Sequence, residues 1–120
     1  MNYNKGDIIQ GQHKDAYHPI LFLEEKDSTF FYGIMLTKAG NYDDNIPLPE
    51  QYIVKEKRGI KFLFQYNHTN FVNIKLLKKK EWQPFTKIGE VTSEGIKYIE
   101  ENITLNEARV WEDFLNKKKY

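Results

Sequence analysis

Two apolar, β-favouring runs separated by a short polar segment constrain this chain more than any other feature. Residues 16–23 and 30–37 are rich in the β-branched, aromatic and aliphatic residues that are typical of strands. Residues 24–29 between them are polar and turn-like, so we expect the two runs to pair as an antiparallel hairpin. Such a hairpin places the start of its first strand beside the end of its second. We therefore expect His18 and Thr37 to share one rim of the sheet, where we place the candidate site.

Short segments of β type continue to about residue 90. Residues 6–10, 51–54, 60–66 and 71–77 all have strand composition, and residues 51–54 are expected at a sheet edge. No helical pattern separates these segments, so the strands must pair mainly in an antiparallel way. The sequence therefore predicts a mainly β fold, either a small antiparallel β-barrel or a strongly curved sheet.

The period of the apolar residues changes in the last third of the chain. A cap residue at Thr92 followed by isoleucines near helical spacing predicts a helix over residues 92–101. Residues 104–107 fit a capping box that precedes a second apolar stripe. One or two C-terminal helices, within residues 92–118, are thus expected to pack on the β-rich residues 1–90.

Composition limits the class of protein. The 120 residues are expected to form one domain, and 40% hydrophobic and 15% aromatic residues are typical of an ordered globular chain. No apolar run is long enough for a membrane helix or a signal peptide, so a cytoplasmic protein that makes no membrane contact is expected. The absence of cysteine excludes disulfides, thiol nucleophiles and thiolate metal sites, and it fits a reducing compartment.

The net charge of +1 hides an uneven distribution. Between Lys55 and Lys87 there are nine basic residues against two acidic ones, a net charge of +7, so the rest of the chain carries −6. Aromatic residues alternate with these cations, as on a surface that contacts phosphates and stacks on bases. Strands with one wet and one buried face show the same alternation. Both interpretations stay open on the sequence alone.

Most motifs of catalysis and cofactor binding are absent. The chain has no Gly-x-Ser-x-Gly elbow, no glycine-rich phosphate loop and no His-Glu-x-x-His metal motif. The neighbouring acids at residues 24–25 and 43–44 are interpreted as solvated turn residues, because adjacent side chains need not face each other. We therefore expect no metal and no cofactor.

Short motifs mark three of the expected strands. Gly6-Asp7 opens the first strand, His18-Pro19-Ile20-Leu21 the second, and the third ends in Ile34-Met35-Leu36-Thr37. These motifs resemble those of the MazF/PemK family of toxin endoribonucleases. Residues 88–94 then lead into a helix in the same order as in that family. The resemblance runs over nearly the whole chain.

This resemblance implies an SH3-like barrel that acts as a homodimer on single-stranded RNA and is held inactive by a cognate antitoxin with a disordered tail. Family members cleave without metal: the ribose 2′-hydroxyl attacks its own phosphate and leaves a cyclic phosphate and a 5′-hydroxyl. The threonine of the third motif carries over as Thr37. The family arginine before proline does not, because His18 stands there. Histidine differs from arginine in exchanging its proton near neutral pH.

A ribonuclease with histidine at this position would assign proton transfer and charge stabilisation to different residues. His18 would accept the 2′-hydroxyl proton or protonate the leaving oxygen, and His13 would be the second proton-transfer group. Thr37 would donate to a non-bridging phosphate oxygen, while Lys38 or Lys75 would supply positive charge. Further candidates for RNA binding follow in the chain, namely Lys78, Lys79, Lys80 and Trp82.

Other interpretations of these residues stay open. The change to histidine is equally compatible with lost catalysis, and His18 would then be a strand-end residue bonded to a carbonyl. Trp82 stacks on a base in one interpretation and closes the core in the other. The alternative function is a non-catalytic SH3-like barrel that binds RNA or a protein target, as a gyrase-poison-like relative or a phage-defence module. His68, in an expected turn, is interpreted as a solvent-exposed residue without a role.

Overall fold

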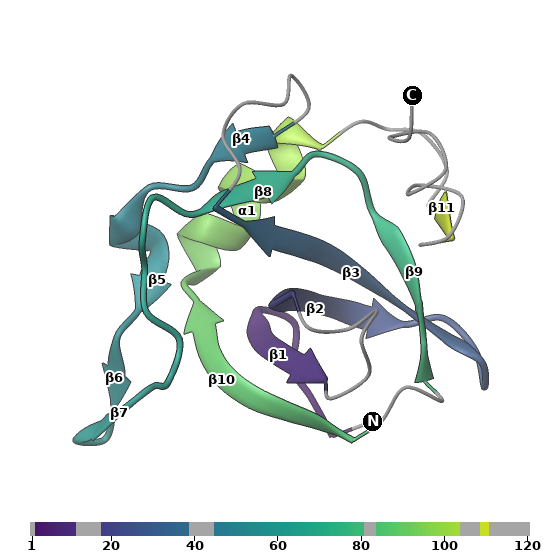
Figure 1. Ribbon diagram of the computed structural model, residues 1–120, viewed down its shortest axis with the longest axis horizontal. Helices are drawn as coiled ribbons and strands as arrows, with labels where there is room; N and C mark the ends of the chain where they lie inside the picture. Colours follow the sequence, from purple (N-terminus) through teal and green to yellow (C-terminus); the bar gives the residue numbers. More distant parts are fainter. Residues whose placement is uncertain (1, 12–17, 39–44, 81–83, 104–108, 111–120) are drawn as a thin grey trace.

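The computed structural model describes residues 2–11, 18–38, 45–80, 84–103 and 109–110. This described part is built mostly of strands, with an α-helix near its C-terminal end (Figure 1). The elements in chain order are β1 (Asp7–Gly11), β2 (Ile20–Glu25), β3 (Phe30–Thr37), β4 (Asn45–Pro47), the 3-10 helix η2 (Glu50–Tyr52), β5 (Ile53–Val54), β6 (Glu56–Lys57), β7 (Ile60–Lys61), β8 (Asn70–Val72), β9 (Leu76–Lys79), β10 (Phe85–Val91), α1 (Ser93–Asn102) and β11 (Arg109–Val110).

Nine of the described strands form one curved sheet. Its order is β11–β9–β3–β2–β1–β10–β5, and β8 extends it by pairing with both β3 and β4. The described pairings are antiparallel, except that β11 runs parallel to β9. No described pairing joins β5 to β11, so the sheet does not close on itself. The prediction of a mainly β, antiparallel fold with a C-terminal helix is confirmed, in its curved-sheet form. The edge strand predicted over residues 51–54 forms only at β5, because residues 51–52 belong to η2, and β5 lies at the sheet edge.

The predicted hairpin lies at the centre of the sheet. β2 and β3 pair in an antiparallel way, with Ile20 opposite Met35 and Leu21 opposite Ile34. At Gly33 in β3, a Cβ would come within 2.5 Å of Cγ2 of Ile20. This position therefore needs a residue without a side chain, and the glycine lets the two strands pack closely.

The turn of this hairpin is shorter than predicted. Glu24 and Glu25 continue β2 and do not belong to the turn. Asp27 organises the reversal, because its Oδ1 accepts the backbone N–H groups of Thr29 and Phe30, both at 2.8 Å. A side chain that satisfies two backbone donors makes a compact turn. The chain therefore reverses using only the residues between β2 and β3.

The predicted strand over residues 60–66 is paired only at its start. Ile60–Lys61 forms β7, which pairs with β6 in a separate hairpin, called here the β6–β7 arm. Arg58 and Gly59 connect the two strands with φ values of 54° and 81°, as a type I′ turn requires. The chain then leaves the arm and runs beside β10, where the Phe64 N–H donates to the Ile88 carbonyl at 2.7 Å.

The predicted strand over residues 71–77 is divided into β8 and β9. Both strands pair with β3, but Phe71 lies opposite Leu36 whereas Leu76 lies opposite Gly33. Five residue steps along this segment therefore correspond to three along β3. The pairing register shifts between the two strands, so the prediction of one continuous strand is wrong.

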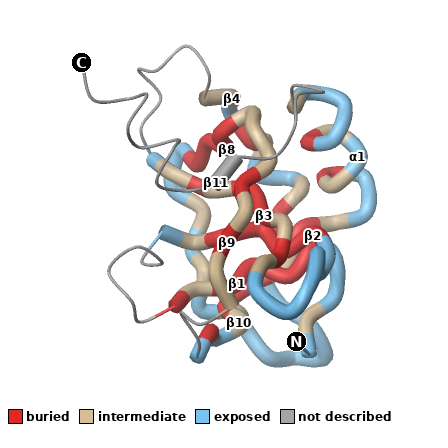
Figure 2. Tube along the Cα trace, turned by 90° about the vertical axis from the view of Figure 1, so that its right-hand side faces the viewer, coloured by how far each residue is buried: buried red, intermediate tan, exposed pale blue. Residues whose placement is uncertain are grey.

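The core lies on both sides of the sheet, because neighbouring residues of a strand point to opposite faces. Ile8 belongs to one buried cluster and Ile9 to the other, and Leu21 and Ile20 divide in the same way. The helix α1 covers the first side, where Ile99 is fully buried. Figure 2 shows the buried stretches concentrated along the central strands. The hairpin is thus anchored from both faces.

The helix α1 begins where the sequence predicts. Thr92 is its N-cap, and Oγ1 of Thr92 accepts the backbone N–H of Gly95 at 3.0 Å. The second predicted helix falls mostly on residues 104–108 and 111–118, which lie outside the described residues. At Arg109–Val110 the helix prediction is wrong, because these residues pair with the free edge of β9 as β11. In the described ranges, no helix has the length and apolar character needed to cross a membrane.

Candidate functional site

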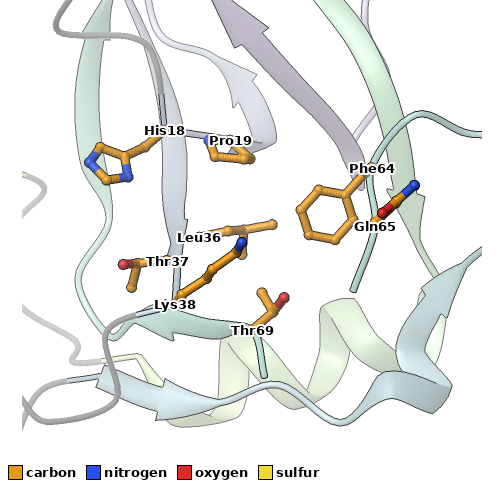
Figure 3. Close-up of a pocket in the computed structure, with 8 residues that line it drawn as sticks. All are labelled: His18, Pro19, Leu36, Thr37, Lys38, Phe64, Gln65 and Thr69. Atoms are coloured by element: carbon orange, nitrogen blue, oxygen red, sulfur yellow. The ribbon is translucent and has the colours of Figure 1, made fainter. Parts of the chain in front are cut away.

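The hairpin brings His18 and Thr37 to the same pocket, as its expected geometry predicts. His18 precedes β2 and Thr37 ends β3, and the two strands are joined at this end by the Leu36 N–H, which donates to the Pro19 carbonyl at 2.9 Å. Both side chains line a pocket of about 310 Å³, and Lys38, the next residue after β3, lines it as well. In Figure 3 the His18 and Thr37 side chains project to the same side, whereas the Lys38 side chain extends toward the centre of the view. Three of the residues predicted from the sequence are therefore brought together.

The walls of this pocket come from residues to which the sequence assigned no role in the site. Pro19 and Leu36 form apolar surface beside the hairpin, and Phe64 lies across from them (Figure 3). Gln65 and Thr69 complete the lining with polar groups. Apolar and polar residues alternate in the segment after the β6–β7 arm, which contains Phe64 and Gln65. This alternation indicates an extended segment, but it does not indicate which strand the segment lies against.

The pKa of His18 lies below the ordinary histidine value of 6.5. Partial desolvation against the protein is the larger cause, and the positive charge of Lys78 is the second. Both causes disfavour the imidazolium form. His18 is therefore mostly neutral at pH 7, and a neutral imidazole can accept a proton from a bound hydroxyl.

Lys78 lies beneath the surface. It belongs to β9, opposite Phe31, and only 2% of it is exposed. The expected role of Lys78 as a surface contact for phosphate does not fit this burial. Lys78 affects the site through its positive charge, which lowers the pKa of His18.

The other predicted RNA-binding residues have different surroundings. The Lys75 ammonium lies 5.4 Å from the ring centre of Tyr32, a cation–π contact. Lys80 is 3.6 Å from the Glu25 carboxylate. Lys79 ends β9 and is half-buried. Neither Lys75, Lys79 nor Lys80 lines the pocket, and the predicted residues His13 and Trp82 lie outside the described residues.

Much of the positive charge between residues 55 and 87 is compensated by acids. Lys87 lies 3.1 Å from Asp7 and 2.7 Å from Glu90, and Lys57 lies 3.2 Å from the same Glu90. We call these four residues the β1–β10 charge cluster. The pKa of Glu90 is lowered, mainly by its hydrogen bond from Lys87. The sequence count of +7 therefore overstates the charge that this region offers to a ligand.

Metal binding and known relatives give no further assignment. Within the described ranges, no three His, Cys, Asp or Glu side chains come together as metal ligands. Comparison with protein-family models, with curated proteins and with solved structures finds no match for this chain. We therefore infer the function from the geometry of the pocket.

Proposed function

We propose that this protein is a metal-independent endoribonuclease of the MazF/PemK type that cleaves single-stranded RNA. The observation that carries the proposal is that His18, Thr37 and Lys38 line one pocket. They supply a proton acceptor, a hydrogen-bond donor and a positive charge. These are the groups that intramolecular phosphodiester cleavage requires when no metal takes part. The resemblance of the motifs around the hairpin supports the same assignment.

In this proposal the neutral imidazole of His18 removes the proton of the ribose 2′-hydroxyl. The 2′ oxygen then bonds to the adjacent phosphorus while the bond from phosphorus to the 5′ oxygen breaks. The products are a 2′,3′-cyclic phosphate and a 5′-hydroxyl, and the departing oxygen takes up a proton. His13 is our candidate for the general acid that donates this proton. In this scheme one group acts as the general base and a second group as the general acid.

Thr37 and Lys38 act on the charge of the reacting phosphate. The transition state places additional negative charge on the non-bridging oxygens. A hydroxyl donor and an ammonium group beside those oxygens stabilise that charge more strongly than they stabilise the substrate. Lys38 is exposed at the end of β3, so its flexible side chain can reach a phosphate at the pocket mouth.

The first prediction concerns cleavage in the presence of EDTA. The purified protein is expected to cut a long single-stranded RNA into discrete fragments that carry 5′-hydroxyl ends. His18→Ala should lower the rate by about 10²-fold or more, because the proton acceptor is lost. Thr37→Ala should also lower it. Thermal unfolding of both variants checks that the fold is kept, and the 5′ ends are measured by direct labelling with a polynucleotide kinase.

A matched control comes from a histidine that does not line the pocket. His68 is exposed and has a φ of 47°, so His68→Asn removes an imidazole while keeping a residue that tolerates this backbone conformation. This variant should cut at the wild-type rate. Near-wild-type cutting by His18→Ala, or intact RNA from folded wild-type protein, would contradict the proposal.

The second candidate function is a non-catalytic binder built on the same curved sheet. It is favoured by two large apolar side chains near the arm, Ile60 and Leu63, which are 72% and 76% exposed. Exposed apolar groups of this size are common where a protein partner docks. Intact RNA in the cleavage assay, together with a protein target lost in Leu63→Ser, would favour this function.

The proposal includes the partners that such a toxin has. We propose a cytoplasmic homodimer that is inhibited by an antitoxin, whose disordered tail would bind basic surface of the toxin. A small gene adjacent to the one for this chain is the place to look for the antitoxin. Its product should suppress cleavage when mixed with the toxin, and sedimentation measures whether the free toxin is a dimer.

A further inference from the structure

Phe64 is anchored to β10 at the wall of the pocket. Its N–H donates to the Ile88 carbonyl at 2.7 Å, which fixes its backbone to β10. A Cβ on Gly89 would lie 2.9 Å from the Phe64 Cβ, so the glycine in β10 is what allows this close approach. The ring is partly buried against the core and also lines the pocket. An aromatic ring fixed in this way can support a flat ligand without losing side-chain freedom.

Thr69 places a buried hydroxyl in the same pocket. It is 4% exposed and lines the pocket below the Phe64 ring (Figure 3). Its Oγ1 accepts the backbone N–H of Asn67 at 3.3 Å. A hydroxyl that accepts from the protein still has its own proton to donate. Since polar groups are costly to bury without a partner, this donor favours a ligand with an acceptor at its edge.

The size and lining of the pocket fit one unstacked base. Its volume of about 310 Å³ lies at the lower end of the range for small-molecule sites, which is about 300–1,000 Å³. Pro19 and Leu36 provide apolar surface opposite the aromatic ring. Proteins that read single-stranded RNA commonly stack a splayed base on an aromatic ring and bond to its edge.

We propose that the pocket binds one nucleobase of the RNA beside the scissile phosphate, with Phe64 as its stacking surface and Thr69 as the residue that selects the base. This inference rests on the proposed function for taking RNA as the ligand. His18 and Thr37 line the same pocket, so a base held in it would set which phosphate reaches them. Base selection would thus determine the cleavage site.

The test uses RNA that cannot be cleaved, so that binding is measured apart from catalysis. Short 2′-O-methyl oligomers of A, C, G or U lack the attacking hydroxyl, and fluorescence anisotropy gives their affinities. Wild-type protein should prefer one base by about tenfold. Thr69→Val removes the hydroxyl at similar size and should abolish the preference, whereas Thr69→Ser retains a hydroxyl and should keep it. Thermal unfolding checks that the variants are folded.

A second pair of variants tests stacking. Phe64→Leu keeps an apolar side chain but removes the aromatic face, and it should weaken binding of the preferred oligomer about tenfold. Phe62→Leu is the matched control, because Phe62 is also partly buried but does not line this pocket. It should leave the affinity unchanged.

The outcomes separate this inference from the proposed function. Equal binding of all four oligomers, no binding of any, or equal loss in Thr69→Val and Thr69→Ser would overturn the base pocket, while cleavage of natural RNA would still stand. Thr69-dependent preference in a protein that never cuts RNA would support the pocket and overturn the nuclease. Cleavage sites of wild type and Thr69→Val that differ at one fixed position would support both.

Discussion

The pocket and the β1–β10 charge cluster both contain positive side chains, but they differ in whether described acidic residues pair with those side chains. In the cluster, Lys87 lies 3.1 Å from Asp7 and 2.7 Å from Glu90, so its charge is balanced within the protein. At the pocket, Lys38 forms no ion pair with any described residue, and the pKa of His18 is lowered. The sequence places lysines in both regions without distinguishing them.

The difference indicates what each region is used for. Asp7 lies in β1 while Lys87 and Glu90 lie in β10, so the cluster connects neighbouring strands. Lys57 connects the arm to the same cluster. Among the described residues, Lys38 at the pocket has no such compensation. Paired charges thus contribute to the fold, whereas unpaired ones suit binding.

The largest effect that would test this comparison is a loss of stability. Asp7 is 5% exposed, and its carboxylate accepts the Asn4 N–H at 2.9 Å besides pairing with Lys87. Asp7→Ala should lower the free energy of unfolding by about 2 kcal/mol, because both partners lose a buried acceptor. Urea denaturation measures this change. Glu24→Ala, which removes an exposed carboxylate, is the control.

Cleavage per folded molecule should be unchanged in Asp7→Ala. A stability equal to that of wild type would show that the β1–β10 charge cluster does not hold the strands together. A fully stable but inactive protein would break the comparison altogether, because the cluster would then serve the pocket.

A smaller effect is expected in the pH dependence of cleavage. His18 must be neutral to accept a proton, so the rate should fall as the pH drops through its pKa, below 6.5. Lys78 is a positive neighbour that lowers this pKa, so Lys78→Met should raise it and move the acid limb to higher pH. Profiles of kcat/KM against pH measure the shift. Lys97→Met, a change at an exposed position on α1, should leave the limb in place.

The smallest effect concerns the salt dependence of RNA binding. Loss of one phosphate contact reduces the slope of log affinity against log salt by about 0.7 for a single strand. Lys38→Ala should show such a change, whereas Lys57→Ala should show less, because Lys57 is already paired with Glu90 at 3.2 Å. Equal changes in the two variants would show that pairing with an acid does not remove a lysine from RNA binding.

The parts of the fold that depend on local pattern could be predicted from the sequence. The pairing of residues 20–25 with 30–37 follows from two β-type runs joined by a short polar segment. The start of α1 follows from Thr92, whose cap bond forms within three residues. The proximity of His18 and Thr37 follows from the antiparallel pairing of the hairpin alone. These features depend on neighbours that are close in the chain.

The parts that depend on distant pairing could not be predicted. Phe64 and Thr69 join the pocket only because their segment folds back beside β10 and β3, which no local periodicity specifies. The break in residues 71–77 arises from a register shift against β3. Of the two acids that pair with Lys87, Asp7 in β1 is far away in the sequence, and only Glu90 is close. Distance along the chain hid these contacts.

The bond between Phe64 and Ile88 has a consequence for biosynthesis. β10 pairs with β1, the first strand of the chain, and it also anchors the wall that carries Phe64. A ribosome that has not yet made residues 85–91 therefore holds a chain whose hairpin can form but whose pocket has no fixed wall. Closing so long a loop is slow compared with forming a local hairpin. The Phe64 wall of the pocket can therefore be fixed only after β10 has been made.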